Sequence, residues 1–412
     1  MKHFKPLSIY AFTIFINAAI SFGTFSLLTH YLTEVDYGII NLYTSFSVFL
    51  TPFIAIGVPF ILSVDYFKMN AEMYRRNFTN SLMIPVAACV LFTLLSLLLY
   101  PVMQEFIKVN FFFTITIPFV CLMIVLNEIA LNLFRNKERP FLFAAFSISK
   151  NIFEIGLTIL LVVGLGYKWQ GRLGSSLLSL IIASVVIIFI IRQWKLYTAT
   201  IDKKIIATIL VAGLPFIPER LAIFVLGYSD RFFIDHYNGI AEVGYYGVGA
   251  QLAVIITLSI VALNNTFYPQ LYKALSPKEI EYKQVKKITG AFIGLSLLIT
   301  VSVLVSIPFI FKYFIGPVFQ PGMKYAVYLT VGLFFWAIYN VFIVFLLNLK
   351  KNKLIMYISL LGMILSLLAN FLNIRNFGAL GAAYTSILVY FSMAAITIFF
   401  VHKYYGLQNF IK

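Results

Sequence analysis

The sequence is poor in charge and in cysteine. Only 11% of its 412 residues are charged, whereas 61% are hydrophobic, and it contains two cysteines. So few charges and so many apolar side chains cannot cover a water-exposed surface, which excludes a soluble protein of this length. Cys89 and Cys121 lie within apolar runs and fit no metal-ligand spacing. We expect both to face lipid or the protein core, and they indicate nothing about the redox compartment.

Motifs of catalysis and nucleotide binding are also missing. The chain has no Gly-x4-Gly-Lys-Ser/Thr loop, which argues against ATP hydrolysis. It lacks His-Glu-x-x-His, Cys-x-x-Cys and a serine nucleophile elbow, the short signatures of metalloproteases, thiol redox centres and serine hydrolases. We therefore expect a protein that is not an enzyme and that uses no cofactor and no metal.

What the sequence has in abundance is long apolar runs separated by short charged or Pro/Gly-rich breaks. About 20 apolar residues span a hydrocarbon core of ~30 Å. The first run is too long for a signal-peptide core and has no small-x-small cleavage site, so we interpret it as a retained span. The pattern predicts an all-α membrane protein with short connections and about twelve transmembrane helices, whose cores are residues 7–31, 39–63, 82–100, 111–133, 142–165, 174–191, 206–235, 246–271, 288–313, 325–349, 354–373 and 381–401.

The basic residues are distributed unevenly between these spans. Of 31 Lys and Arg residues, 22 fall at the termini and in the even-numbered connections, and six in or beside the odd-numbered ones. The other three, Lys150, Arg220 and Arg231, lie inside spans. Such a bias predicts that both termini are cytoplasmic. The net charge of +16 then faces anionic lipid head groups, and we expect membrane lipids rather than nucleic acid as its partner.

Two pairs of similar segments recur at half the length of the chain. His30-Tyr31, followed by TEVDYG, has a counterpart in His236-Tyr237, followed by NGIAEVGYYG, at an offset of 206 residues. GRLGSSLLSLI from Gly171 matches GALGAAYTSIL from Gly378 at an offset of 207. Because six spans separate each pair, the repeat is parallel. It predicts two six-helix bundles, residues 1–200 and 201–412, related by a pseudo-two-fold axis along the membrane normal.

Several segments carry a resemblance to a known family. They are LTHYLTEVDYGIINLY (28–43), NKERPFLFAAFSISKNIFEIGLTILL (136–161), YSDRFFIDHYNGIAEVGYYGVGAQLA (228–253) and the two Gly-x-Leu-Gly turns. With them the chain resembles polysaccharide flippases of the Wzx type, in the superfamily that also holds multidrug-toxin exporters and the lipid II flippase. The resemblance covers essentially the whole chain in length, span number and loop pattern.

The resemblance implies a fold, a function and partners. The fold is a V-shaped pair of six-helix bundles around a central cavity. The function is movement of undecaprenyl-pyrophosphate-linked oligosaccharide from cytoplasm to periplasm by alternating access, for O-antigen or capsule-type polysaccharide. The implied protein partners are a polysaccharide polymerase and a chain-length regulator.

The seventh predicted span contains two acid–base doublets, Glu219-Arg220 and Asp230-Arg231. Ionisable residues at membrane depth are costly and usually face a cavity or a partner. In a regular helix Arg220 and Arg231 would lie on one face, because 11 residues correspond to about 1100° of rotation, and about 16 Å apart. Arginine suits phosphate because its planar fork makes bidentate contacts. We expect these four residues to bind the pyrophosphate or acidic sugars of the implied substrate; pairing with other helices is the structural alternative.

Three helix-breaking residues precede these doublets: Gly213, Pro215 and Pro218. Proline removes a backbone donor and kinks a helix. The sequence therefore predicts a bend in the seventh span, which could act as a hinge, although membrane helices also carry purely structural prolines.

Other charges at membrane depth are Lys150, Glu154 and Glu128. Lys150 and Glu154 are spaced i, i+4 near the cytoplasmic end of the fifth span, so they either neutralise each other or bind substrate through Lys150 and a coupling ion through Glu154. Glu128, with Asn127 and Asn132 nearby toward the cytoplasmic end of the fourth span, is a second candidate for a proton or sodium site.

Other functions remain open on the sequence. A drug/cation antiporter of the same superfamily would favour an acidic cavity, whereas the deepest charges here include arginines. A major-facilitator sugar permease would carry a Gly-x3-Asp-x2-Gly-Arg-like loop between spans two and three, which is absent. A membrane polysaccharide polymerase or ligase would have one or two large periplasmic loops, whereas the outward connections here are short.

The charge bias generates a topology prediction. We expect both termini and residues 65–81, 134–141, 192–205, 274–287 and 350–353 to be cytoplasmic. Reporter enzymes that are active only in the periplasm, fused after residue 205 or residue 353, should therefore be silent. Strong activity at either position would contradict this orientation.

Overall fold

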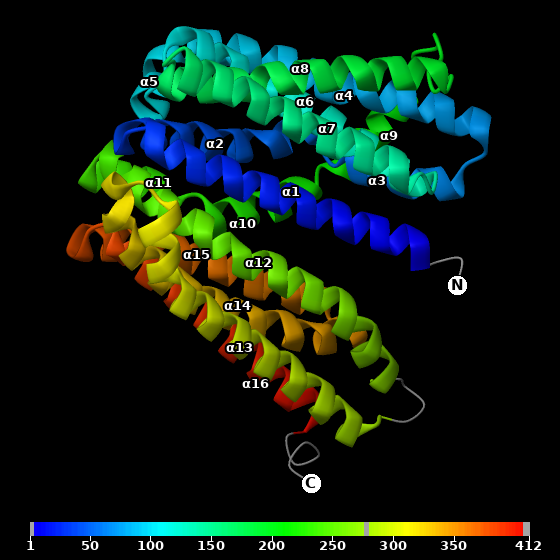
Figure 1. Ribbon diagram of the computed structural model, residues 1–412. Helices are drawn as coiled ribbons and strands as arrows, with labels where there is room; N and C mark the ends of the chain where they lie inside the picture. The colour runs from blue at the N-terminus through cyan, green and yellow to red at the C-terminus, as the bar shows by residue number, and fades with distance from the viewer. Residues whose placement is uncertain (1–3, 276–279, 407–412) are drawn as a thin grey trace. The chain divides into compact units, whose positions relative to one another are not determined.

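The computed structural model describes residues 4–275 and 280–406, and this part of the chain is helical (Figure 1). Sixteen α-helices are joined by short turns, with a π-helical turn, η1, at Ile159–Gly164 and a 3-10 turn, η2, at Pro317–Gly322. The α-helices are α1 Phe4–Tyr31, α2 Glu34–Ala55, α3 Val58–Lys68, α4 Ala71–Leu98, α5 Tyr100–Ile107, α6 Phe111–Asn136, α7 Pro140–Thr158, α8 Lys168–Gln193, α9 Lys203–Gly213, α10 Phe216–Gly227, α11 Asp230–Asn238, α12 Ile240–Ala274, α13 Tyr282–Phe314, α14 Met323–Asn348, α15 Asn352–Phe377 and α16 Leu380–Tyr405.

The helices confirm the predicted membrane class. Eleven are long and apolar enough to cross a membrane, and the bent pair α9 and α10 makes a twelfth candidate. Large apolar side chains on their outer faces are exposed, for example Leu98 at 76% and Val305 at 73%. Such exposure is unfavourable in water and favourable in lipid. The chain is a multi-pass integral membrane protein.

The chain forms two compact units, residues 1–224 and 225–412, called here the first and the second unit. In the first unit α6 packs against α2, α4 and α8, while α7 packs against α1 and α8. In the second unit α14 packs against α12, α13 and α16. The predicted bundles, with their boundary after residue 200, and the repeat that relates them stay predictions. The extreme termini, residues 1–3 and 407–412, lie outside the described residues, and their cytoplasmic placement also stays a prediction.

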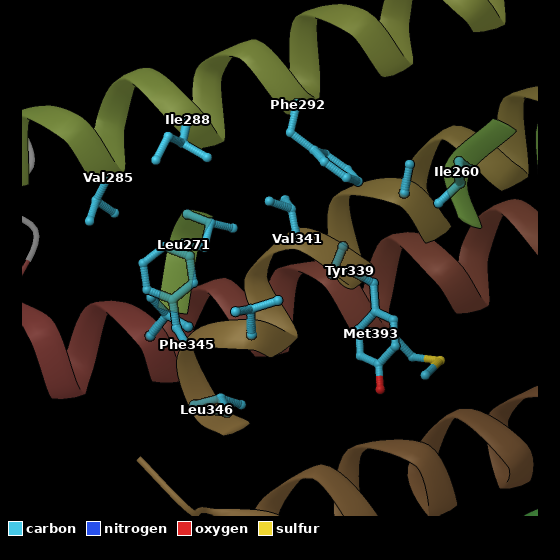
Figure 2. Packing of buried hydrophobic residues seen from close by; sticks show 14 of the residues in the cluster. Ile260, Leu271, Val285, Ile288, Phe292, Tyr339, Val341, Phe345, Leu346 and Met393 are labelled. Carbon is cyan, nitrogen blue, oxygen red and sulfur yellow. The ribbon is translucent and has the colours of Figure 1, made fainter. Parts of the chain in front are cut away.

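The second unit has a large apolar core. Figure 2 shows Val285, Ile288 and Phe292 projecting from α13 toward the side chains of α12 and α14. Phe292 and Phe345 are fully buried. On α13 these buried residues recur three and four positions apart, which places them on one helix face. The opposite face is left for lipid.

The connection between α8 and α9, residues 194–202, is fastened to α4. The Asn80 side-chain oxygen accepts a hydrogen bond from the Asp202 amide at 2.7 Å, and Arg76 pairs with the Asp202 carboxylate at 2.7 Å. That carboxylate also caps α9, accepting from the Lys204 amide at 2.9 Å. The Lys204 amide is the main reason why the pKa of Asp202 lies below its ordinary value. α9 itself packs against α3 and α4 and belongs to the first unit.

Two predicted spans are interrupted well inside their length, whereas the predicted span 82–100 is divided only at its end, at Leu99. The predicted span 39–63 divides at Ile56 and Gly57, which both have positive φ, 41° and 67°, and so cannot continue a right-handed helix. The predicted span 206–235 divides between Gly213 and Phe216, where the bend of 41° confirms the predicted kink. It divides again after Gly227, and α11 begins at Asp230.

The first breaks of these two spans touch each other. A Cβ atom on Gly213 would overlap the carbonyl oxygen of Ile56. A Cβ atom on Gly57 would lie 2.7 Å from the Phe216 ring and 3.2 Å from the Gly213 Cα. Glycine at both positions therefore lets two backbones approach more closely than any side chain would allow. In addition, the rings of Phe60 and Phe216 lie 4.9 Å apart across the crossing.

We predict that Gly213→Ala destabilises the first unit. The added methyl has no space against the Ile56 carbonyl, and such overpacking costs about 1–3 kcal/mol. The apparent melting temperature of the detergent-purified protein should therefore fall by several degrees. Gly156→Ala in α7 is the matched control, because a Cβ there meets nothing within 4 Å. Equal melting temperatures for both variants would contradict the proposed close approach.

Candidate functional site

A cavity lies beside the crossing of the two broken spans, within the first unit. Its volume is about 270 Å³, and α2, α3, α6 and α10 contribute its walls. Apolar residues dominate the lining, with one acid, Glu128, and one base, Arg220. An apolar pocket with a few convergent polar groups is the usual form of a small-molecule site. In membrane transporters such sites are often built from interrupted helices.

One wall of the cavity carries a stripe of hydroxyl groups. Thr44, Ser47 and Thr51 of α2 all line it, at the three- and four-residue spacing that places side chains on one helix face. Each hydroxyl donates to the carbonyl oxygen four residues earlier, at 2.7, 2.9 and 2.7 Å. The oxygens keep lone pairs that can accept from a ligand's O–H groups. The sequence reasoning missed this stripe, although its helical spacing was the signal.

The cavity brings together two residues that the sequence singled out separately. Arg220 Nη2 lies 3.5 Å from Glu128 Oε1, and the two side chains are 54% and 37% exposed. A long, exposed ion pair of this kind contributes about 0–1 kcal/mol. The Arg220 guanidinium is therefore held loosely and is accessible from the cavity. Glu219, its neighbour, is exposed and lies in the first turn of α10, where the helix dipole favours an acid.

Arg231 and Asp230 are in a different environment, within the second unit. Their side chains are 9% and 10% exposed and form an ion pair at 2.7 Å. The same guanidinium nitrogen donates to the Gly227 carbonyl at 2.6 Å, and the Tyr246 hydroxyl donates to the other Asp230 oxygen. Asp230 occupies the first turn of α11, and this network holds the start of that helix against α12.

The prediction of one arginine-bearing helix face is wrong. It required a regular helix from Arg220 to Arg231, but α10 ends at Gly227 and α11 begins at Asp230. The two residues also belong to different compact units. The Gly-Tyr-Ser-Asp sequence at 227–230 contains helix stop and start signals that were overlooked: glycine commonly follows a helix end, and serine commonly precedes a helix start. Whether either arginine binds substrate stays a prediction.

A second polar cluster lies between α7 and α8. Glu154 accepts from Lys150 at 3.1 Å and from Arg172 at 2.7 Å, and all three side chains are at most 25% exposed. The predicted Lys150–Glu154 pair is therefore confirmed, but it lies in the middle of the span Pro140–Gly164 rather than near one end. Arg172, which falls between the predicted spans 142–165 and 174–191, lies inside α8 and contacts Glu154. One carboxylate between two cations leaves the trio with one net positive charge.

Neutral polar residues extend this cluster toward α1. Asn17 donates to Ser147 at 2.7 Å and accepts from Asn151 at 2.9 Å. The hydroxyls of Thr158 and Ser175 lie 2.7 Å apart. Hydrogen bonds of this kind join helices in an apolar surrounding. In residues 4–275 and 280–406, no group of three or more His, Cys, Asp or Glu side chains could hold a metal ion.

Comparison with known proteins points to one family. The model of the family described as polysaccharide biosynthesis protein matches residues 5–275. Protein 1 of the Lsg locus of Haemophilus influenzae is 31% identical over 158 residues, 38% of this chain and 39% of that protein. A membrane protein of the same organism is 34% identical over 64 residues, 16% of either chain. The matched segments thus span well under half the length of these relatives.

Solved transporter structures share the fold. The lipid II flippase MurJ in an inward closed conformation has a TM-score of 0.76 at 15% identity, covering 98% of this chain and 89% of that one. An inward-facing multidrug resistance MATE family transporter of the MOP superfamily has a TM-score of 0.72 at 12% identity, covering 94% of both chains. These structural similarities establish the twelve-helix transporter fold. The sequence identities are too low to indicate anything about the substrate.

We predict that Glu154→Ala destabilises the protein. It would leave the Lys150 and Arg172 cations unpaired in a largely buried position. Removing one partner of a buried ion pair lowers the free energy of unfolding by about 3 kcal/mol, and by somewhat less for side chains that are partly exposed, as these are. The apparent melting temperature and the amount of protein in the membrane should both fall. Glu219→Ala is the matched control, since that side chain is exposed. A Glu154→Ala protein as stable as the control would show that the trio contributes no stability.

Proposed function

The chain belongs to the polysaccharide biosynthesis protein family, and we propose that it is a flippase for undecaprenyl-pyrophosphate-linked oligosaccharide repeat units. It moves them across the cytoplasmic membrane by alternating access, for O-antigen or capsule-type polysaccharide. This activity is transport, with no covalent bond made or broken, and it supplies a polysaccharide polymerase and its chain-length regulator on the far side. The proposal includes the topology predicted from the distribution of basic residues, in which both termini are cytoplasmic.

The observation that carries the proposal is the Arg220 side chain in the cavity. Arginine makes bidentate, charge-assisted hydrogen bonds to phosphate. Within residues 4–275 and 280–406, the ion pair that Arg220 would give up is the 3.5 Å contact with Glu128. The hydroxyl stripe of α2 faces the same space and suits the hydroxyl groups of a sugar. Small-ligand pockets typically measure about 300–1,000 Å³, so a cavity near the lower limit fits a pyrophosphate or one sugar and not a whole repeat unit.

The other predicted contacts fit this proposal to different degrees. Lys150 belongs to a trio with net positive charge, which favours an anionic substrate group nearby. A phosphate that approached Arg231 would have to compete with the buried Asp230 carboxylate. Glu128 and Glu154 remain the proposed coupling-ion residues. Glu128 is the more accessible of the two, at 37% against 15% exposure of the side chain.

The competing proposal is a drug/cation antiporter, and Glu128 is the observation in its favour. A carboxylate in an apolar cavity can attract an organic cation. Here Arg220 lies next to that carboxylate and neutralises it, which weakens cation binding and leaves the flippase as the better-supported proposal.

We predict that Arg220→Ala removes surface glycan without removing the protein. The assay is glycan display in a flippase-null strain complemented with each variant, with membrane protein level measured by blot. Losing a charge-assisted hydrogen bond worth about 1.5–3 kcal/mol should reduce the affinity for the substrate, and with it the amount of displayed glycan, about tenfold or more. Arg220→Lys should restore part of the display, because it keeps the charge and loses the planar fork.

Arg192→Ala is the control for that assay. Arg192 is exposed in the last turn of α8 and does not line the cavity, so glycan display should remain normal. Normal display by Arg220→Ala at normal protein level would show that Arg220 does not bind substrate. Efflux of cationic dyes by the wild-type protein, without glycan display, would favour the antiporter.

A further inference from the structure

A surface groove lies between the end of α12 and the start of α13 in the second unit. Its volume is about 690 Å³. One part of its wall is basic and carries Lys283 and Lys287. Another part is apolar and consists of Phe267, Ile288 and Ala291. The groove thus combines two surfaces that a single amphipathic ligand could cover at once.

The basic part has an excess of positive charge. Lys283 and Lys287 are both exposed and lie one turn apart, so their like charges repel each other. Within residues 4–275 and 280–406, neither lysine forms an ion pair. The lining includes one acid, Glu281, so the groove keeps a net positive charge. An anion between the lysines would relieve their repulsion.

The groove lies where α13 passes from a polar to an apolar surrounding. Further along the helix, Leu295, Leu297 and Leu298 are 40%, 48% and 61% exposed, as expected for side chains in contact with lipid. At 1.5 Å per residue, Lys287 and Leu295 are about 12 Å apart along the axis. Ile288 and Ala291 occupy the interval. The groove therefore connects the level of the head groups with the level of the acyl chains.

We propose that this groove binds one anionic phospholipid, with its phosphate between Lys283 and Lys287 and the first part of an acyl chain along Ile288 and Ala291. A free phosphate would use the lysines and leave the apolar wall empty, whereas a membrane lipid uses both. The predicted topology places residues 274–287 on the cytoplasmic side, the side where anionic lipids attract basic segments. The site is independent of the transported substrate, and its test does not depend on glycan display.

The test is lipid binding by the full-length protein purified in detergent, measured by native mass spectrometry. The wild-type protein is titrated with phosphatidylglycerol, with phosphatidylcholine and with inorganic pyrophosphate. We expect tight binding of one phosphatidylglycerol and weaker binding of phosphatidylcholine. Lys283→Gln with Lys287→Gln should weaken phosphatidylglycerol binding about tenfold or more, since two lysines near an anionic lipid are removed. Ala291→Phe, which fills the groove beside its apolar wall and keeps both lysines, should weaken phosphatidylglycerol binding as well.

Lys203→Gln with Lys204→Gln is the matched control. It removes two exposed lysines at the start of α9 and the same total charge, and phosphatidylglycerol binding should not change. Equal losses in both double variants would show nonspecific attraction and overturn the proposal. Equal affinity for phosphatidylcholine and phosphatidylglycerol would overturn the proposal too. A third contradicting result would be that pyrophosphate displaces the lipid and that Ala291→Phe has no effect on lipid binding, because the groove would then be a site for free phosphate. If the lysine variant does not fold, the wild-type titrations and Ala291→Phe decide the question.

Discussion

The contact between Gly213 and the carbonyl of Ile56 is the constraint on which the candidate site depends. Both spans are interrupted at this point, with Gly57 on one side and Gly213 on the other, and a Cβ atom on either glycine would lie too close to the opposite segment. Interrupting a helix inside a membrane leaves backbone groups that need partners. Here the Ile56 amide still bonds to the Pro52 carbonyl at 3.0 Å, so the break leaves that donor satisfied. The cavity then occupies the space beside the crossing.

The same breaks explain how acids are stabilised in so apolar a chain. Every new helix start has free N–H groups and a positive dipole end, where a carboxylate is favourable. Glu219 and Asp230 both occupy such first turns. Dividing one long span into three segments thus creates two positions for acids that a continuous helix would lack. The arginine that follows each acid then pairs with a carboxylate: Arg220 with Glu128 and Arg231 with Asp230.

Features set by local sequence were predictable, and features set by contacts between helices were not. Apolar length alone identifies the spans, and the prolines around Gly213 identify the kink. The Lys150–Glu154 pair follows from its spacing within one helix. By contrast, Arg172 reaches Glu154 from α8, and Arg220 reaches Glu128 across 92 residues. The break at Ile56 follows Pro52 by four residues and is followed by Gly57 and Pro59, which are local signals for the end of one helix and the start of the next. The contact of Gly213 with the Ile56 carbonyl joins segments far apart in the chain, and no local pattern reveals it.

The two arginines of the seventh span differ in what it would cost to free them. The guanidinium of Arg231 donates at 2.7 and 2.6 Å to Asp230 and Gly227, and removing it would leave a buried carboxylate without its cation, which is strongly destabilising. Arg220 is half exposed, and its contact with Glu128 is long. Exchanging that carboxylate for a phosphate therefore costs little, and Glu128 stays accessible to water or to a cation when the exchange occurs. A cation that binds an anion and later releases it must be held in this loose way, and of the two arginines only Arg220 meets that condition in this structure.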